Sequence, residues 1–117
     1  GTALRDPVSR EYPLRHTLFG FILAMIKSWV GKQAAAVWLR RRPRGLDARV
    51  VARLQRVLAQ LDAAQSLEDL RTPPANRLHK LRGDRSGQYA IRVNDQFRVC
   101  FRWQDGDAWD VEFVDYH

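Results

Sequence analysis

A change of hydrophobic period at Pro74 restricts the possible folds of this chain more than any other feature of its sequence. Before Pro74, Val50, Leu54 and Leu61 recur at helical spacing, which predicts a helix over 46–64 with one buried stripe. After Pro74, apolar and polar residues alternate, as they do in strands with one buried face. Helices followed by strands are typical of an α+β domain.

Other local signals mark the N-terminal half. The segment MIKSWV at 25–30 is expected to form a short strand. Residues 31–42 are predicted to form an Ala-rich helix that ends in basic residues, as helix C-termini prefer. Ser66 and Asp69 have the spacing of a capping box, which starts one further short turn. The Thr72-Pro73-Pro74 run is expected to end all helical structure.

Strands are predicted over 89–93, 97–103 and 109–113. Asn94-Asp95 fits the first turn, and Asp105-Gly106 is a strong signal for a two-residue hairpin at the second. We therefore expect two N-terminal helices packed on one face of a twisted antiparallel β-sheet. The aromatic and β-branched positions should face the helices, and on the last strand these are Trp109, Val111 and Phe113.

The 117 residues are enough for one domain. The first 24 carry two prolines and no sustained period, and Met25 is the only methionine. We expect 1–24 to be an N-terminal extension and 25–117 to be the domain; a regulatory or partner-binding arm is the alternative. The longest apolar stretch, 18–26, is far shorter than the ~20 residues of a membrane span, so a cytoplasmic protein without membrane contact is expected.

The composition narrows the kinds of partner and cofactor. Lys and Arg total 20 against 13 acids, a net charge of +7, which points to polyanions such as nucleic acid, the ribosome or an acidic partner. The single Cys100 excludes an internal disulfide and every multi-cysteine zinc pattern. No metal site and no cofactor are expected.

The predicted sheet places arginines on its uncovered face. Arg92, Arg98 and Arg102 alternate with the apolar positions and should share that face. Residues 77–102 hold seven bases and two acids, whereas 104–117 hold five acids and no base. Cross-strand ion pairing on a solvated sheet is the alternative to a functional patch.

Acid–base groups lie outside that patch, at His79 and in the ending Asp115-Tyr116-His117. Histidine titrates near neutrality, tyrosine and aspartate orient it or exchange protons, and arginines stabilise a phosphorane. Such a set suits RNA transesterification, in which a 2′-hydroxyl attacks the neighbouring phosphate. Taken singly, a terminal histidine is more often a frayed end, and Tyr116 could simply pack.

A second basic patch lies on the predicted helix 46–64. Arg49, Arg53 and Arg56 are spaced along one face, away from the apolar stripe. A solvated helix surface is the commoner meaning of such spacing. The alternative is a surface that contacts the phosphate backbone without sequence readout.

Four motifs occur in order along 25–117: MIKSW, SLEDL, LHKLRGDRSGQYAIRVNDQFRVCFRW and DGDAWDVEFVDYH. Together they resemble the HigB toxins of the RelE-type superfamily, and nothing in 1–24 takes part. The resemblance implies a ribosome-dependent endoribonuclease that cuts mRNA in the ribosomal A site by 2′-hydroxyl attack. It also implies a HigA-like helix-turn-helix antitoxin as partner, through which alone the toxin would meet DNA.

The resemblance carries roles onto single residues. The implied catalytic residues are His79, Arg82, Arg98, Asp115, Tyr116 and His117. Arg82 occupies a position where some relatives have a lysine. An arginine can supply positive charge there, but it cannot transfer a proton as a lysine could. The RNA- or ribosome-binding residues come from the two basic patches and not from the resemblance: Arg49, Arg53, Arg56, Lys80, Arg92 and Arg102. Two other functions stay open: a gyrase-inhibiting toxin of the same fold, which would lack the terminal acid–base cluster, and a non-catalytic RNA-binding module.

Overall fold

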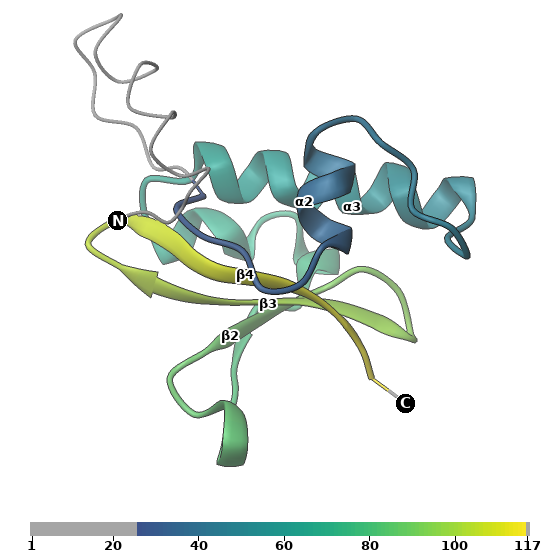
Figure 1. Ribbon diagram of the computed structural model, residues 1–117. Coiled ribbons are helices and arrows are strands. Elements are labelled where there is room, and N and C mark those ends of the chain that lie inside the picture. Colours follow the sequence, from purple (N-terminus) through teal and green to yellow (C-terminus); the bar gives the residue numbers. More distant parts are fainter. Residues whose placement is uncertain (1–25, 117) are drawn as a thin grey trace, which may run out of the picture.

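The computed structural model describes residues 26–116 and arranges them in two layers (Figure 1). Helices α2 (Gln33–Trp38) and α3 (Ala48–Ala63) lie on one face of a four-stranded antiparallel sheet. The strands are adjacent in chain order: β1 (His79–Lys80), β2 (Tyr89–Arg92), β3 (Phe97–Gln104) and β4 (Asp107–Asp115). The predicted α+β architecture is confirmed. The expected boundary between 1–24 and 25–117 lies outside the described residues.

Helix α3 provides the predicted apolar stripe. Leu54, Leu58 and Leu61 are completely buried, in one core cluster with Val99 and Phe101 of the sheet. Burial of each such side chain away from water contributes about 1.5–3 kcal/mol to the free energy of unfolding.

Among residues 26–116, no helix has the length and apolar character needed to cross a membrane.

Helix α2 is shorter than predicted. It ends at Trp38, and Arg40 has a φ of 66°, in the left-handed region that glycine usually takes. The amides of Arg40 and Arg41 donate back to the carbonyls of Val37 and Ala36, at 3.0 and 2.8 Å, which is the hydrogen-bond pattern of a Schellman motif. The prediction of a helix to residue 42 was therefore wrong, and the arginines lie in the loop beyond α2.

Helical structure does not end at the double proline. The capping box of Ser66 and Asp69 is confirmed at the start of a 3₁₀ helix, η2 (Leu67–Arg71). Two more 3₁₀ turns follow, η3 (Pro74–Asn76) and η4 (Gly83–Arg85). Proline suits the first turn of a helix because that turn needs no amide donor, so Pro74 begins a turn instead of excluding one.

Residues 26–30 extend along the free edge of β4 without forming a regular strand. Two isolated parallel bridges, Ile26 to Ala108 and Trp29 to Val111, replace the predicted strand over 25–30. Between them, Ser28 Oγ accepts from the Asp110 amide at 2.8 Å and donates to Asp110 Oδ1 at 3.1 Å. The segment thus covers the edge at the point where β4 is irregular.

That irregularity is a β-bulge that reverses the alternation of β4. Cys100 pairs with Glu112 but Arg102 pairs with Trp109, so β4 has one extra residue, and Asp110 has a φ of 52°. Ala108, not Trp109, consequently packs in the core. The prediction that Trp109 shares the buried face was wrong, since alternation counted along the sequence does not register a bulge.

Candidate functional site

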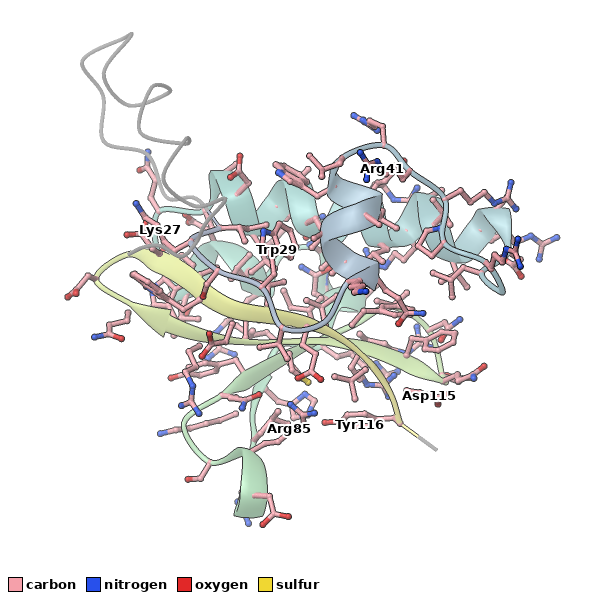
Figure 2. All side chains as sticks on the ribbon, in the orientation of Figure 1. Lys27, Trp29, Arg41, Arg85, Asp115 and Tyr116 are labelled. Atoms are coloured by element: carbon pink, nitrogen blue, oxygen red, sulfur yellow. The ribbon has the colours of Figure 1, made fainter. Side chains whose placement is uncertain are left out.

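The face of the sheet away from the helices carries the candidate site. Figure 2 shows Arg85 and Tyr116 on that side of the sheet. Residues paired across antiparallel strands share a face. The register therefore forms two rows on the open face: His79, Ala90, Cys100 and Glu112, and beside them Arg92, Arg98 and Val114. We call this surface, together with Tyr116, the open face.

Arg98 is held in place at one end of the open face. Its Nη1 donates to the carbonyl of Asn94 and, at 3.0 Å, to that of Phe97. Its guanidinium carbon lies 5.1 Å from the centre of the Tyr116 ring, a cation–π arrangement. The other N–H groups of Arg98 have no acceptor among the residues described. They remain available to an anion above the sheet.

Arg92 lies directly opposite Arg98 on the neighbouring strand. Like charges in opposite positions destabilise a sheet. Asp95 offsets part of this repulsion through an ion pair with Arg92, which lowers the pKa of the Asp95 carboxyl. An anion bound between the two arginines would offset the rest.

Tyr116 and Cys100 form the floor beside Arg98. Cys100 is completely buried, and its thiol interacts with the Tyr116 side chain. Burial raises the pKa of both groups. The Cys100 thiol is therefore protonated at neutral pH and is not a thiolate nucleophile. The Tyr116 amide donates to the Gln96 carbonyl at 2.7 Å, which fixes the end of β4 to the β2–β3 turn.

Arg85 and Glu112 belong to the same cluster, and the sequence did not single them out. Arg85 Nη1 donates to Glu112 Oε1 at 3.0 Å and to Gln88 Oε1 at 3.1 Å. The bond to Glu112 raises the pKa of Arg85, and the Arg85 charge in turn acts on Tyr116. The opposite net charges of residues 77–102 and 104–117 predicted ion pairs between these two segments, but they did not identify which residues would pair.

The ion-pairing alternative therefore holds for part of the basic patch. Arg85 pairs with Glu112, and the exposed Arg102 lies 3.4 Å from Asp110. Arg98 makes no such pair within 26–116. The basic patch therefore contains two kinds of arginine. Arg85 and Arg102 pair with acidic residues of the last strand, whereas Arg98 does not.

The terminal triplet is divided between the two faces. Asp115 pairs with Phe97, on the helix side of the sheet, and its Oδ2 accepts from Gln96 Nε2 at 3.1 Å. Tyr116 follows on the open face. His117 lies outside the described residues. The structure therefore brings Tyr116, but not Asp115, to Arg98.

The remaining candidates of the C-terminal half lie around β1. His79 Nδ1 is 2.9 Å from the Arg77 carbonyl; because a carbonyl can only accept, this hydrogen bond needs a proton on Nδ1, and Nε2 has no hydrogen-bond partner among residues 26–116. Arg82 is exposed at the start of η4. Lys80 is exposed and pairs with Tyr89, whose ring stacks on Phe101 on the helix side.

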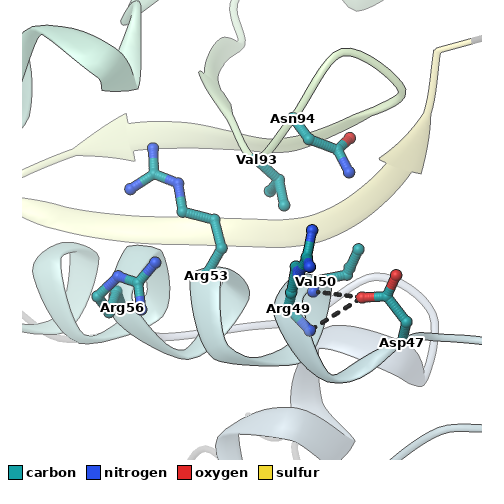
Figure 3. Close-up of a pocket in the computed structure, with 7 residues that line it drawn as sticks. All are labelled: Asp47, Arg49, Val50, Arg53, Arg56, Val93 and Asn94. Atoms are coloured by element: carbon teal, nitrogen blue, oxygen red, sulfur yellow. Dashed lines mark hydrogen bonds between the residues drawn. The ribbon is translucent and has the colours of Figure 1, made fainter.

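The three helix arginines line a separate pocket, shown in Figure 3. They lie on one side of α3 as predicted, but only Arg49 and Arg56 are exposed. Arg53 donates from Nη2 to the Arg92 carbonyl at 2.7 Å and to Asn76 Oδ1 at 3.0 Å. Burial, and then the charges of Arg56 and Arg92, lower the pKa of Arg53. Over 26–116, no group of three or more His, Cys, Asp or Glu residues could hold a metal ion.

Comparison with known families adds to this geometry. The family described as RelE-like toxin of type II toxin–antitoxin system HigB matches residues 40–117. Toxin HigB-1 of Vibrio cholerae is 48% identical over 64 residues, which are 55% of this chain and 66% of the relative. Endoribonuclease HigB of Proteus vulgaris is 32% identical over 93 residues, which are 80% of this chain and 100% of the relative.

Solved structures resemble the fold. The heterotetrameric YoeB–YefM toxin–antitoxin complex of Staphylococcus aureus contains a chain that matches with a TM-score of 0.53 and 18% identity, over 80% of this chain and 99% of that one. A YafQ mutant from Escherichia coli matches with a TM-score of 0.52 and 16% identity, over 80% and 93% of the two chains. At these identities the likeness concerns the fold alone.

Proposed function

Because the chain belongs to the HigB family of RelE-like toxins of type II toxin–antitoxin systems, we propose that it is an endoribonuclease that cuts mRNA in the ribosomal A site. The observation that supports this most is Arg98. Its Nη1 is anchored to two carbonyls and its guanidinium is stacked on Tyr116, while its remaining donors point to no partner in the described chain. That is the preorganisation needed to stabilise a phosphorane.

The proposed reaction is a transesterification. A base removes the proton of a ribose 2′-hydroxyl, whose oxygen then attacks the adjacent phosphorus. The bond from phosphorus to the 5′-oxygen breaks, and an acid protonates that oxygen as it leaves. The products are a 2′,3′-cyclic phosphate and a 5′-hydroxyl. These steps need a base, an acid and cations, so we propose that neither a metal nor a cofactor takes part.

We propose the following roles for the candidate residues. Arg98, with Arg82, would carry the charge that develops on the phosphorane. The free Nε2 of His79 can accept a proton, which suits a base or a group that orients substrate. Asp115 is bound to Gln96 on the other face, so we assign it a supporting role and the second proton transfer to His117. Tyr116 positions Arg98.

Substrate binding extends beyond the reacting groups. We propose that Arg92 and Arg102 contact RNA around the open face, and that the exposed Lys80 contacts it from the edge strand β1, on the helix side of the sheet. Arg49 and Arg56 would contact ribosomal RNA from the helix layer, with Arg53 holding the shape of that surface because its Nη2 is already engaged. A HigA-like helix-turn-helix antitoxin would be the protein partner, and it alone would bind DNA.

The proposal is tested by primer extension on a translating mRNA with the purified chain, with and without ribosomes. We expect cuts within codons only when ribosomes are present, 5′-hydroxyl ends, and unchanged activity when a zinc-selective chelator is added while magnesium stays at the level that ribosomes need. Cuts with 5′-phosphate ends would contradict the transesterification. An intact mRNA together with inhibited gyrase would indicate the gyrase-directed toxins of the same fold.

A further inference from the structure

Three arginines occupy neighbouring positions across the sheet at one end of the open face. Arg92 of β2 is paired with Arg98 of β3. On the other side of β2, His79 is paired with Ala90, and the same register continued by two residues places Arg77 next to Arg92. Neighbouring strands lie about 4.8 Å apart, so these positive charges repel one another unless an anion lies among them. We call Arg77, Arg92 and Arg98 the arginine row.

Arg77 is held at this row by its backbone. Its φ is 46°, in the left-handed region, and its amide donates to the Pro74 carbonyl at 3.0 Å. Its carbonyl lies 2.9 Å from His79 Nδ1. The exposed Arg77 side chain makes no hydrogen bond or ion pair within residues 26–116. Arg77 therefore brings an additional cation to the proposed ribonuclease site.

Asp95, in the β2–β3 turn (residues 93–96), brings a single carboxylate to the arginine row. Its side chain is 99% exposed and forms an ion pair with Arg92. The hydrogen bond and the charge of Arg92, and then the charges of Arg98 and Arg77, lower the pKa of the Asp95 carboxyl. All three arginines thus act on this carboxylate, which offsets one of their three positive charges.

A phosphodiester suits this row better than Asp95 does. An exposed ion pair contributes little to stability, so Asp95 can leave Arg92 at little cost. A phosphodiester has two non-bridging oxygens and can bind two guanidinium groups at once, whereas Asp95 pairs with Arg92 alone. The Arg92 backbone is already fixed, because Arg53 Nη2 donates to its carbonyl at 2.7 Å.

We propose that Arg77 and Arg92 form a second phosphate site for the RNA phosphodiester next to the scissile one, and that the Asp95 carboxylate occupies this site until RNA displaces it. The inference rests on the proposed function, because it takes Arg98 as the contact to the scissile phosphate. Asp95 is then an internal competitor that lowers the affinity of the free chain for RNA.

Fluorescence anisotropy with a short labelled 2′-O-methyl RNA tests the site. This RNA lacks the 2′-hydroxyl nucleophile, so binding is measured without cleavage. Asp95→Asn should lower the Kd about threefold or more, because no carboxylate then competes with phosphate. Arg77→Ala should raise the Kd about three- to tenfold, as expected for a lost charge-assisted hydrogen bond. It should also reduce the salt dependence of binding, by a slope of about 0.7 for one phosphate contact.

The exposed ion pair of Glu68 and Arg71 supplies matched controls. It has the same i, i+3 spacing as the pair of Arg92 and Asp95, and it lies in η2, outside the arginine row. Glu68→Gln changes the net charge as Asp95→Asn does, and Arg71→Ala changes it as Arg77→Ala does. Both controls should leave the Kd for the RNA near that of the intact chain.

Inorganic phosphate gives an independent measurement. At constant ionic strength, phosphate should raise the melting temperature of Asp95→Asn more than that of Glu68→Gln, because a ligand that binds only the folded chain stabilises it. The same melting curves show whether every variant is folded. Stabilisation by phosphate without a gain in RNA affinity would assign the site to free phosphate and overturn the proposal.

Two further results would overturn the proposal: a Kd of Asp95→Asn no lower than that of Glu68→Gln, or a Kd of Arg77→Ala no higher than that of Arg71→Ala. Cleavage of ribosome-bound mRNA by the intact chain separates this inference from the proposed function. The expected shifts in RNA affinity without any cleavage would contradict the nuclease and support the second phosphate site. Cleavage without those shifts would do the opposite.

Discussion

On the open face, the Arg98 side chain is held in place by the fold. Its Nη1 donates to two backbone carbonyls, and its guanidinium lies against the Tyr116 ring. A free arginine side chain gives up rotamer freedom worth up to about 1.5–2 kcal/mol when it is fixed. Because Arg98 is fixed by the fold, a phosphate that binds to it meets less of this entropic cost.

The first prediction concerns Arg98. Arg98→Ala should lower the rate of mRNA cleavage about 100- to 1000-fold, as expected when a preorganised donor to the transition state is lost. Arg98→Lys should restore only part of the rate, because an ammonium cannot reproduce the guanidinium fork. Single-turnover cleavage rates measure both effects. Arg102→Ala, which removes an arginine paired with Asp110, should have a much smaller effect.

The second prediction concerns pH. Burial raises the pKa of the Cys100 thiol above its ordinary 9.0, so the folded chain keeps a proton that the unfolded chain loses. The free energy of unfolding should therefore be unaffected by this group below pH 9.0 and should fall as the pH rises through the folded pKa. Urea unfolding at a series of alkaline pH values measures the fall. Cys100→Ala should make the decline shallower, and an identical decline would show that Cys100 does not cause it.

Side-chain chemistry could be predicted from the sequence at this site, but the partners of each side chain could not. Arg98 and Tyr116 were both candidates, yet their contact depends on the fold: Arg98 reaches back to Asn94, and β4 brings Tyr116 beside its guanidinium. Asp115 adjoins Tyr116 in the chain and still lies on the other face. Neighbours in a strand point to opposite sides, so adjacency in sequence is a poor guide to a site on a sheet.

Among the helices and strands, periodicity predicted α3 and the three long strands well, because buried stripes determine those elements. It failed where one residue changes the backbone. Arg40 ends α2 in a left-handed conformation, and Asp110 introduces the bulge that turns Trp109 outward. Neither residue is a glycine, so nothing in the sequence indicated a positive φ at these positions. The two-residue β1 is too short to show any period.

The third prediction concerns Asn76, which joins three elements. Its buried side chain donates to Gln60 Oε1 at 2.8 Å and to the Leu70 carbonyl at 3.0 Å, and accepts from Arg53. Asn76→Ala should lower the free energy of unfolding by about 2–3 kcal/mol, because it leaves buried polar groups without partners. Gln60→Ala removes a single hydrogen bond and should cost roughly 1 kcal/mol or less. Equal losses in denaturant titrations of the two variants would contradict the assigned role of Asn76.

In the molecule as a whole, the two layers separate two basic surfaces. The open face holds Arg98 and the helix layer holds Arg49 and Arg56, and the β2–β3 turn lies between them. The net charge of +7 predicted a polyanionic partner, but it does not show how the basic residues are distributed between the two surfaces. The distribution depends on the register of the strands and on the position of α3. The sequence pattern determines these two features only in part.

The fourth prediction follows from that separation. The double variant Arg49→Ala, Arg56→Ala should weaken ribosome binding and make its salt dependence shallower, by a slope of about 0.7–0.9 for each phosphate that is no longer neutralised. Arg98→Ala should leave ribosome binding near normal. Sedimentation with ribosomes over a salt series measures both. A double variant with an unchanged slope would mean that the helix arginines form only a solvated surface.

The proposed ribonuclease site on the open face is built around Arg98, Tyr116 and the chain end. The decisive experiment measures mRNA cleavage on ribosomes by the intact chain, by Arg98→Ala and by a chain that ends at Tyr116, with thermal melting of each. We expect normal melting for all three, and cleavage that falls about a hundredfold or more in both variants relative to the intact chain. Undiminished cleavage by the folded Arg98→Ala variant would show that the open face is not the ribonuclease site proposed for it.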